Sequence, residues 1–392
     1  MKQTMSQINK YIPLLLLVLA ACAGPKSAPQ EPMAMDFLPQ RGEFVTVDGS
    51  RAAPEVVLAL ARTADYLLLG EGHRNECDHA VQQLLVRKLA EGGRLPAVGL
   101  EMVGADLQPV LDRFNNGELA PEAMEKELGW QENWGYPFAL FEPLFRIARE
   151  HGLPLGALNA PRALVKKVSE KGLEALAPEE RAQLPRIIVP PLGEQREELQ
   201  AIQAMHAEKG QGSGELERFV LVQSLWDTAM AEHAVDLRRR TGRPVVVVAG
   251  AGHVERGWGI ASRLRGQDPS ARIVLLVPLR DSLDFDRRDG DGFFYCPDTF
   301  QSRMGMTLEA REGSVVVDAV QRESRADRAG LRPGDVLVRA QGLAVHSFQD
   351  LHLAGKRAHD EQKSLVFVLL RRGERIAVDL GPLGKSPAST KE

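Results

Sequence analysis

Five uninterrupted apolar runs of strand length constrain this chain more than any other feature of its sequence. Strands with one solvent-exposed face alternate apolar and polar residues, whereas continuous apolar runs are typical of the strands of a parallel sheet that is covered on both faces. Stretches of helical periodicity, such as 78–91, 140–151 and 216–240, lie between the runs. The repeated order of strand, helix and strand predicts an α/β domain with a parallel sheet. The five runs are 65–70, 96–101, 153–158, 245–249 and 273–277.

The composition changes along the chain and predicts two folded parts. Residues 161–214 are charged, helix-rich and punctuated by proline, which indicates a helical insert or lid within the first domain. A charged, glycine-containing run at 282–292 is expected to end that domain, and Tyr295 is expected to lie in the linker beyond it. We therefore expect an α/β domain at 37–290 and a small β-rich domain at 297–385, with one helix at 348–359.

The N-terminus resembles a bacterial lipoprotein signal. Lys2 and Lys10 precede an eleven-residue apolar run, which is too short to span a bilayer, and Leu-Ala-Ala leads directly into Cys22. We expect residues 1–21 to be removed, Cys22 to carry the lipid and residues 22–36 to act as a flexible tether. An ordinary secretory signal is the alternative. Ala23, in place of an aspartate, favours the periplasmic face of the outer membrane over retention at the inner membrane.

Charge and cysteine content exclude several classes of function. The net charge of −4 and the pI near 6.2 argue against a nucleic-acid partner, because such proteins present basic surfaces to phosphates. The chain has no CxxC pair and no Walker loop. Its three cysteines are too few to predict a disulfide framework.

Polar groups with binding or acid–base chemistry follow four of the expected strands. Because ligands bind beyond the carboxyl ends of parallel strands, these side chains should converge on one edge of the sheet. Any one of them alone could cap a helix or lie in the core, but together they predict a site. His79, in the first turn of the next helix, could face the same pocket. The converging residues are Glu71, His73, Glu101, Asn159 and His253.

Aromatic residues are concentrated in one short segment. Six of the 21 aromatic residues of the chain lie between residues 130 and 145. Phe141 and Phe145 are four residues apart, which predicts the core face of a helix. Trp130, Trp134 and Tyr136 lie outside that periodic stretch and are therefore candidates for lining a pocket.

The strand-end motifs resemble those of ChaN-like haem-binding lipoproteins, within the Tiki and erythromycin-esterase-like superfamily. The similar segments are 70–73, 99–102, 159–162, 223–230 and 250–254. The resemblance implies haem binding in iron uptake with a tyrosine as iron ligand, for which Tyr136 is the candidate. His73, His253, Trp134, Glu71 and Asn159 would then contribute to the haem site.

The wider superfamily implies a different chemistry for the same residues. In that reading Glu71, His73, Glu101 and His253 hold a divalent metal ion or act as the catalytic groups of a metal-dependent hydrolase. A Cys-Pro pair at Cys296 is a weak further link to haem. A scaffold with a catalytically silent first domain is a third reading, and the sequence leaves a homodimer open.

The C-terminal part resembles a PDZ domain. The segment 326–337 is similar to the bacterial Ala-Gly-Leu-x-x-Gly-Asp motif, and Met304, Gly305 and Met306 resemble the carboxylate-binding loop. The resemblance implies that a peptide C-terminus of an envelope protein adds to a sheet edge, while free amides around Gly305 hold its carboxylate. A purely structural cap on the first domain is the alternative.

Overall fold

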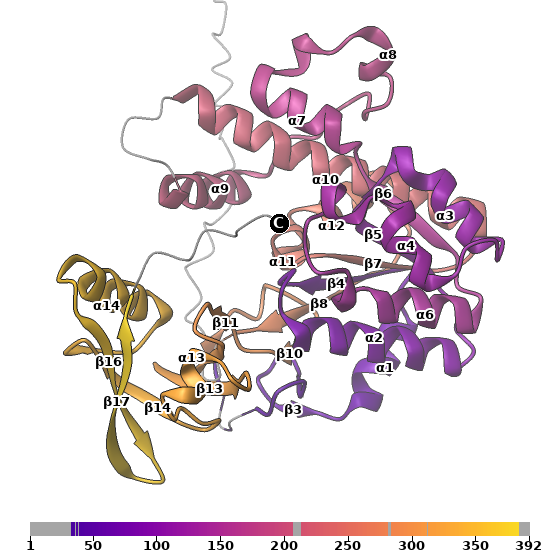
Figure 1. Ribbon diagram of the computed structural model, residues 1–392. Coiled ribbons are helices and arrows are strands. Elements are labelled where there is room, and N and C mark those ends of the chain that lie inside the picture. Colours follow the sequence, from indigo (N-terminus) through magenta and orange to yellow (C-terminus); the bar gives the residue numbers. More distant parts are fainter. Residues whose placement is uncertain are drawn as a thin grey trace, which may run out of the picture. The chain divides into compact units, whose positions relative to one another are not determined.

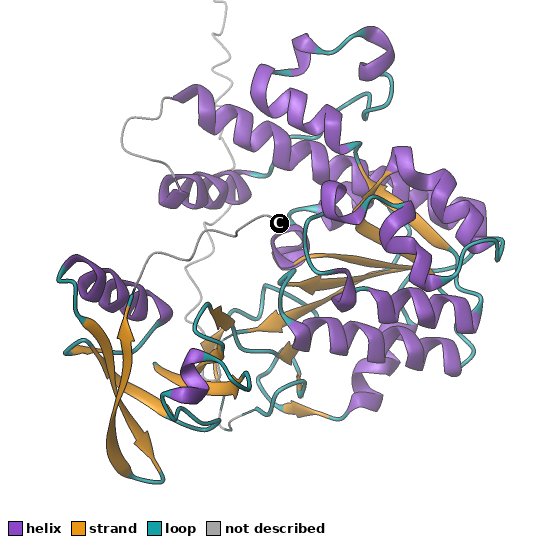
Figure 2. Ribbon diagram, viewed as in Figure 1, coloured by secondary structure: helices purple, strands orange, loops and turns teal. Residues whose placement is uncertain are grey.

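The computed structural model describes residues 33–35, 37, 39–206, 213–280, 284–311 and 313–383. It contains an α/β part and a smaller β-rich part, each with its own sheet (Figures 1 and 2). The expected signal peptide at 1–21 and Cys22 lie outside the described residues. Within the part of the chain that is described, no helix has the length and apolar character needed to cross a membrane.

The α/β part is built on an eight-stranded sheet whose five neighbouring strands β8, β4, β7, β5 and β6 are all parallel. These are the five apolar runs, which confirms the predicted parallel sheet. The strand order is β3-β2-β10-β8-β4-β7-β5-β6. The five central strands are β4 (Tyr66–Glu71), β5 (Ala97–Gly104), β6 (Leu155–Asn159), β7 (Val245–Gly250) and β8 (Ile273–Leu279).

Strand register places the functional groups side by side. In β4 and β7, Glu71 lies opposite Gly250, and in β5 and β7, Leu100 lies opposite Val248. The carboxyl ends of these strands therefore meet at one edge of the sheet. This alignment brings together groups that are up to about 180 residues apart in the sequence.

Helices cover both faces of the sheet, as expected for strands that are apolar on both sides. One face packs against α1 (Pro54–Arg62), α2 (Glu76–Glu91), α3 (Gln108–Asn115) and α6 (Glu142–His151). The other packs against α10 (Ser213–Thr241) and α12 (Ile260–Gln267). Each strand contributes alternate side chains to the two cores: Leu67 and Leu69 to the first, Tyr66 and Leu68 to the second.

The expected helical insert contains α7 (Arg162–Lys171), α8 (Pro178–Arg181) and α9 (Gly193–His206). An apolar cluster that includes Leu164, Val168 and Leu184 packs it against Leu225 of α10. Figure 1 shows α7 and α9 alongside α10. Part of the insert is therefore anchored to the domain core rather than free as a lid.

The sheet continues past residue 290, where the sequence suggested that the first domain ends. Strand β10 (Gly292–Tyr295) pairs in parallel with β8 and in antiparallel with β2 (Phe44–Val45), which in turn pairs with β3 (Arg51–Ala52). Tyr295 is therefore a buried strand residue and not part of a linker. The apolar run 292–295 is short and follows a charged segment, which hid it from the periodicity argument.

Two features were not expected from the sequence: a strand inside the expected tether and a disulfide. Strand β1 (Met33–Ala34), which falls inside the expected tether 22–36, pairs with β9 (Asp284–Phe285). Cys77 and Cys296 form a disulfide across 219 residues of sequence. A single disulfide does not make a disulfide framework. It does mean that Cys296 is not a free thiol, so its Cys-Pro pair offers no free sulfur to a haem.

The β-rich part is an antiparallel sheet in the order β11-β12-β13-β14-β16-β17, with β15 (Leu343–Ala344) beside β14. Helix α14 (Phe348–Asp360) packs on the sheet through Ala354 and Ala358, as predicted for 348–359. A Ser347–Asp350 capping box begins this helix. The strands are β11 (Thr299–Ser302), β12 (Met306–Arg311), β13 (Ser314–Val320), β14 (Val336–Ala340), β16 (Ser364–Arg371) and β17 (Glu374–Pro382).

Candidate functional site

Two carboxylate–imidazole pairs meet at the carboxyl edge of the parallel sheet. The Nδ1 of His73 lies 3.0 Å from Glu71 Oε1, and the Nε2 of His253 lies 3.6 Å from Glu101 Oε1. Gly250 joins the pairs: its amide donates to Glu101 Oε2, and a Cβ added to it would lie only 2.8 Å from His73 Cε1. The predicted convergence of these four side chains is therefore confirmed in geometry.

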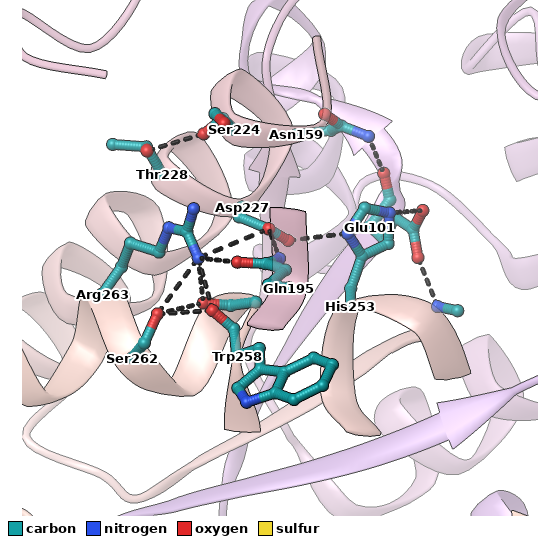
Figure 3. A network of polar contacts seen from close by, with 12 residues as sticks. Glu101, Asn159, Gln195, Ser224, Asp227, Thr228, His253, Trp258, Ser262 and Arg263 are labelled. Atoms are coloured by element: carbon teal, nitrogen blue, oxygen red, sulfur yellow. Dashed lines mark hydrogen bonds and ion pairs between the residues drawn. The ribbon is translucent and has the colours of Figure 1, made fainter. Parts of the chain in front are cut away.

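His253 is part of a buried charge network that extends to the helical insert (Figure 3). Its Nδ1 lies 2.7 Å from Asp227 Oδ1, on α10. The other Asp227 oxygen lies 3.6 Å from Arg263 and accepts a hydrogen bond from Gln195, on α9. Asp227 and Arg263 are 1% and 2% exposed, so each charge depends on the other for compensation.

The surrounding charges raise the pKa values of both site histidines. Burial alone would lower the pKa of His253, but Glu101 and Asp227 outweigh it and raise the pKa to about 9. Burial likewise opposes protonation of His73, while the Glu71 hydrogen bond and the charges of Glu101 and Glu71 raise its pKa. His253 therefore favours the protonated, cationic form at neutral pH, and the charges around His73 shift that imidazole toward protonation.

His79 and Asn159 complete the edge. His79 lies in the first turn of α2, is 3% exposed, and places Nδ1 3.4 Å from Glu71 Oε2, so it does face the site. Asn159 donates from Nδ2 to the Glu101 carbonyl and accepts from the Ala160 amide. Its amide thus holds the ends of β5 and β6 together.

The loop that carries His73 is held by contacts that sequence reasoning missed. Asp78 is fully buried, accepts a hydrogen bond from the Gly72 amide and forms an ion pair with Arg280 at 2.6 Å. Asn75 caps α2 by accepting from the Cys77 amide, and the Cys77 disulfide ties the same turn to the segment after β10. The only local signal for this arrangement was the Asn and the acidic first turn of a helix.

Two of the three aromatic pocket candidates face the site. The rings of Trp134 and Tyr136 lie 4.7 Å and 4.9 Å from the His73 ring, centre to centre, and the Arg74 guanidinium lies 5.2 Å from the centre of the Tyr136 ring. Tyr136 and Trp134 are both partly exposed. Among the described residues, neither the Tyr136 hydroxyl nor Trp134 Nε1 has a hydrogen-bond partner.

Trp130 does not line the pocket, contrary to expectation. It is 2% exposed and packs among Phe138, Phe141 and Phe145, with its Nε1 donating to the Tyr136 carbonyl. The short helix α5 (Trp130–Asn133) turns it inward. Phe141 and Phe145 are buried, as predicted for a helix core face.

The enclosed space at this edge is small. A cavity of about 80 Å³ is bordered by Glu101, Trp134, Asn159, Arg162 and Trp226. Pockets that enclose drug-sized ligands measure roughly 300–1,000 Å³, so a porphyrin does not fit inside. A large planar ligand would instead lie against the partly exposed Trp134–Tyr136 face.

The four residues of the divalent-metal alternative are arranged as two carboxylate–imidazole pairs. Within the described ranges, no group of three or more His, Cys, Asp or Glu side chains is arranged to hold a metal ion. Glu71, His73, Glu101 and His253 are instead paired with one another as hydrogen-bond and charge partners. Such a set can hold and transfer protons and can present positive charge to an anionic ligand.

The Met304–Met306 loop of the β-rich part differs from the expected carboxylate loop. The Gly305 amide is not free: it donates to the Ser302 carbonyl, and the Met304 amide donates to Ser302 Oγ. Beside the loop, a largely apolar cavity of about 720 Å³ lies between the sheet and α14. Met304 and Met306 both line it, as predicted for a peptide-binding groove.

Fold and site together define an α/β protein with a histidine–carboxylate edge, followed by a PDZ domain. The chain belongs to the family described as haem-binding uptake, Tiki superfamily, ChaN, whose model matches residues 57–264. A PDZ domain model matches residues 302–381. Both resemblances that the motifs indicated are thus confirmed.

Solved structures agree with the fold. A ChaN of Campylobacter jejuni, described as binding haem cofacially, has a TM-score of 0.52 and 19% identity, covering 64% of this chain and 96% of its own. That likeness shows the fold alone. A mutant erythromycin esterase in an open conformation reaches a TM-score of 0.37 at 14% identity, over 75% of this chain and 89% of its own, which is too distant to bear on chemistry.

One curated relative is the chloroplastic protein RETICULATA-RELATED 5 of Arabidopsis thaliana. It is 25% identical over an alignment 258 residues long, and the match covers 58% of this chain. The matched region spans only 33% of that protein's length.

Proposed function

We propose that this protein binds haem on the Trp134–Tyr136 face and serves in iron acquisition at the cell envelope. The observation that carries the proposal is the Tyr136 phenol, which has no hydrogen-bond partner among the described residues and lies beside His73 and Arg74. Tyrosine is a recognised axial ligand of haem iron. Membership of a haem-binding family supports the same conclusion.

The residues around Tyr136 suit a porphyrin that lies flat and stays partly exposed. Trp134 and Tyr136 offer aromatic surface to the macrocycle, and Tyr136 would hold the iron through its phenolic oxygen. Arg74, whose guanidinium lies over the Tyr136 ring, would hold the anionic propionates. Bound haem would supply a ferric iron. Because the enclosed cavity is too small, the outer face of the porphyrin would need a cover, and a second copy of the chain is our candidate.

Haemin titration of the purified chain tests the ligand assignment. We expect micromolar haemin to produce a Soret band that weakens or shifts in Tyr136→Phe. Tyr66→Phe is the matched control, because it also removes one tyrosine hydroxyl. The Tyr66 hydroxyl contacts Asp268, and the residue lies in the core on the other face of the sheet. No haem spectrum, or identical spectra for Tyr136→Phe and the wild type, would refute the proposal. Stoichiometric divalent metal in the haem-free protein would favour the hydrolase.

The envelope location is part of the proposal. The Cys77–Cys296 disulfide supports an oxidising compartment, because such bonds are rare in reducing cytosol. We propose that the chain is anchored by a lipid on Cys22 at the periplasmic face of the outer membrane. Mass spectrometry of the mature N-terminus checks this, and an unmodified Cys22 or a different N-terminus would refute it.

The PDZ domain is proposed to recruit the C-terminus of an envelope partner. The cavity between the sheet and α14 supports this role, since its lining is largely apolar and includes Met304 and Met306. Methionine side chains adapt to differently shaped apolar residues. Fixing both partners at one membrane would raise their effective concentration and compensate for modest affinity.

A further inference from the structure

The edge of the PDZ sheet that a peptide would join already carries a strand of this chain. Strand β11 pairs in antiparallel with β12, with Ser302 opposite Met306 and Phe300 opposite Leu308. A three-residue turn ending at Gly305, which has φ of +82°, connects the two strands. The other edge of β12 pairs with β13, so both edges of β12 are occupied.

The direction of β11 is the direction of a bound peptide. A peptide that adds in antiparallel to β12 with its carboxylate at the Met304–Met306 loop must run toward that loop, and β11 runs toward it and ends there at Ser302. The Gly305 amide, the expected carboxylate ligand, donates instead to the Ser302 carbonyl. A backbone carbonyl of the chain thus takes the place expected for the peptide carboxylate.

Alternate side chains of β11 also occupy the positions of peptide side chains. Phe300 and Ser302 both border the cavity between the sheet and α14. The Phe300 ring lies 5.8 Å from the ring of Phe348, the first residue of α14. Ser302 therefore corresponds to the last residue of a peptide, and Phe300 to the residue two positions before it.

We infer that β11 is an internal occupant of the PDZ groove, and that the external partner is a peptide with an apolar C-terminal residue and an aromatic residue two positions earlier. This inference rests on the proposed peptide recruitment. Binding of the partner displaces β11 from β12. The aromatic residue replaces Phe300 against Phe348, and the apolar residue enters the space that Ser302 leaves open.

The unfilled cavity provides the advantage of the external peptide over β11. Serine is small and polar, and about 720 Å³ remains open beside it among Met306, Leu308 and Phe367. Burying an apolar side chain there favours the external peptide by about tenfold or more. Phe300 is 48% exposed, so it buries only about half of its surface in the groove, and the free energy needed to displace β11 is correspondingly small.

A disulfide staple tests whether β11 blocks the groove. Ala310 donates to Asp298, so the hydrogen-bonded pairs of the ladder are 298/310, 300/308 and 302/306, and Gln301 faces Thr307 in a non-hydrogen-bonded pair. Such pairs have a Cα spacing of about 4.5 Å, within the range for disulfides. Gln301→Cys with Thr307→Cys therefore locks β11 in place on the side away from the cavity.

The probe is the fluorescein-labelled peptide Asp-Thr-Phe-Gln-Val with a free carboxylate, titrated into the full chain by fluorescence polarisation. We expect the oxidised staple to abolish binding and reductant to restore it, while the wild type binds equally with and without reductant. We also expect Phe300→Ser to bind at least several-fold tighter than the wild type, and Gln301→Ser, whose side chain points away from the cavity, to bind unchanged. Replacing the phenylalanine of the probe by alanine should weaken binding about tenfold.

Equal affinity of the oxidised staple and the wild type would overturn the inference. Hydrogen exchange of the Leu308 amide, which faces β11, gives a readout that needs no peptide. Rapid exchange in the free chain would likewise overturn the occupancy of the groove. If the amide is protected but the probe binds no variant, including Phe300→Ser, then the partner assignment and the proposed peptide recruitment are wrong. Haemin titration is independent of all these outcomes.

Discussion

The raised pKa of His253 makes the stability of the α/β domain depend on pH in a defined window. The ordinary pKa of histidine is 6.5, and the charges of Glu101 and Asp227 raise that of His253 to about 9. Because the native state holds this proton more tightly than the unfolded chain, the stabilisation is complete below pH 6.5 and is lost as pH rises to 9. At about 1.4 kcal/mol per pKa unit, the loss amounts to about 3 kcal/mol.

Urea unfolding monitored by tryptophan fluorescence isolates this effect. All four tryptophans lie between residues 130 and 258, so their emission reports on the α/β domain and not on the PDZ domain. The perturbation is His253→Gln, which removes the titrating group. The matched control is His233→Gln on α10, where the imidazole contacts only the Leu158 carbonyl.

We expect the free energy of unfolding of the wild type and of His233→Gln to fall by about 3 kcal/mol between pH 6.5 and 9. His253→Gln should lose most of this dependence. The raised pKa of His73 acts in the same direction and accounts for a residual slope. Burial raises the pKa of Glu255 to about 7, so the stabilisation from this group is lost as pH rises from 4.5 to 7, mostly before the window of His253 begins. Parallel curves for the wild type and His253→Gln between pH 6.5 and 9 would refute the assignment of the charge network.

Two further predictions concern the packing of the site. Gly250→Ala should destabilise the domain by about 1–3 kcal/mol in the same urea assay, because its Cβ would lie 2.8 Å from His73 Cε1. Gly252→Ala is the control: its Cβ would have nothing within 4 Å, and the substitution should change stability by no more than about 0.5 kcal/mol. Equal effects of the two substitutions would contradict the close approach of His73 to β7. Replacing Cys77 and Cys296 by serine should cost about 2–4 kcal/mol, measured as a lower urea midpoint, and an unchanged midpoint would show that the bridge does not stabilise the native domain.

The sequence by itself determined the parallel sheet and the edge at which the site lies. Burial on both faces requires apolar residues at every position of a strand, so the five runs could be read directly. Once the strands are parallel, their carboxyl ends share one edge, and residues such as Glu71, His73 and His253 must converge there. The PDZ domain was equally readable, because its glycine-containing turn motif is local.

Only the tertiary structure decided which groups complete the site. Asp227 and Arg263 lie on different helices. In the sequence, each is a charged residue on an apolar helix face, and the periodicity of either helix does not show that the other residue is its partner. Cys77 and Cys296 meet across 219 residues because β10 returns to the sheet. These pairings depend on three-dimensional proximity between distant segments, which local patterns of hydrophobicity do not encode.

The same dependence on tertiary structure explains the different positions of Trp130 and Trp134 and the position of strand β11. Trp130 and Trp134 are both aromatic and four residues apart, yet one is in the core and the other faces His73, because the short helix α5 ends between them. Strand β11 has only four residues, without an alternating pattern of burial, and its place on β12 follows from the tight turn at Gly305, which folds the chain back along the edge of β12. A strand edge accepts any segment whose backbone can reach it, so the choice of occupant belongs to the assembled fold and not to the local sequence.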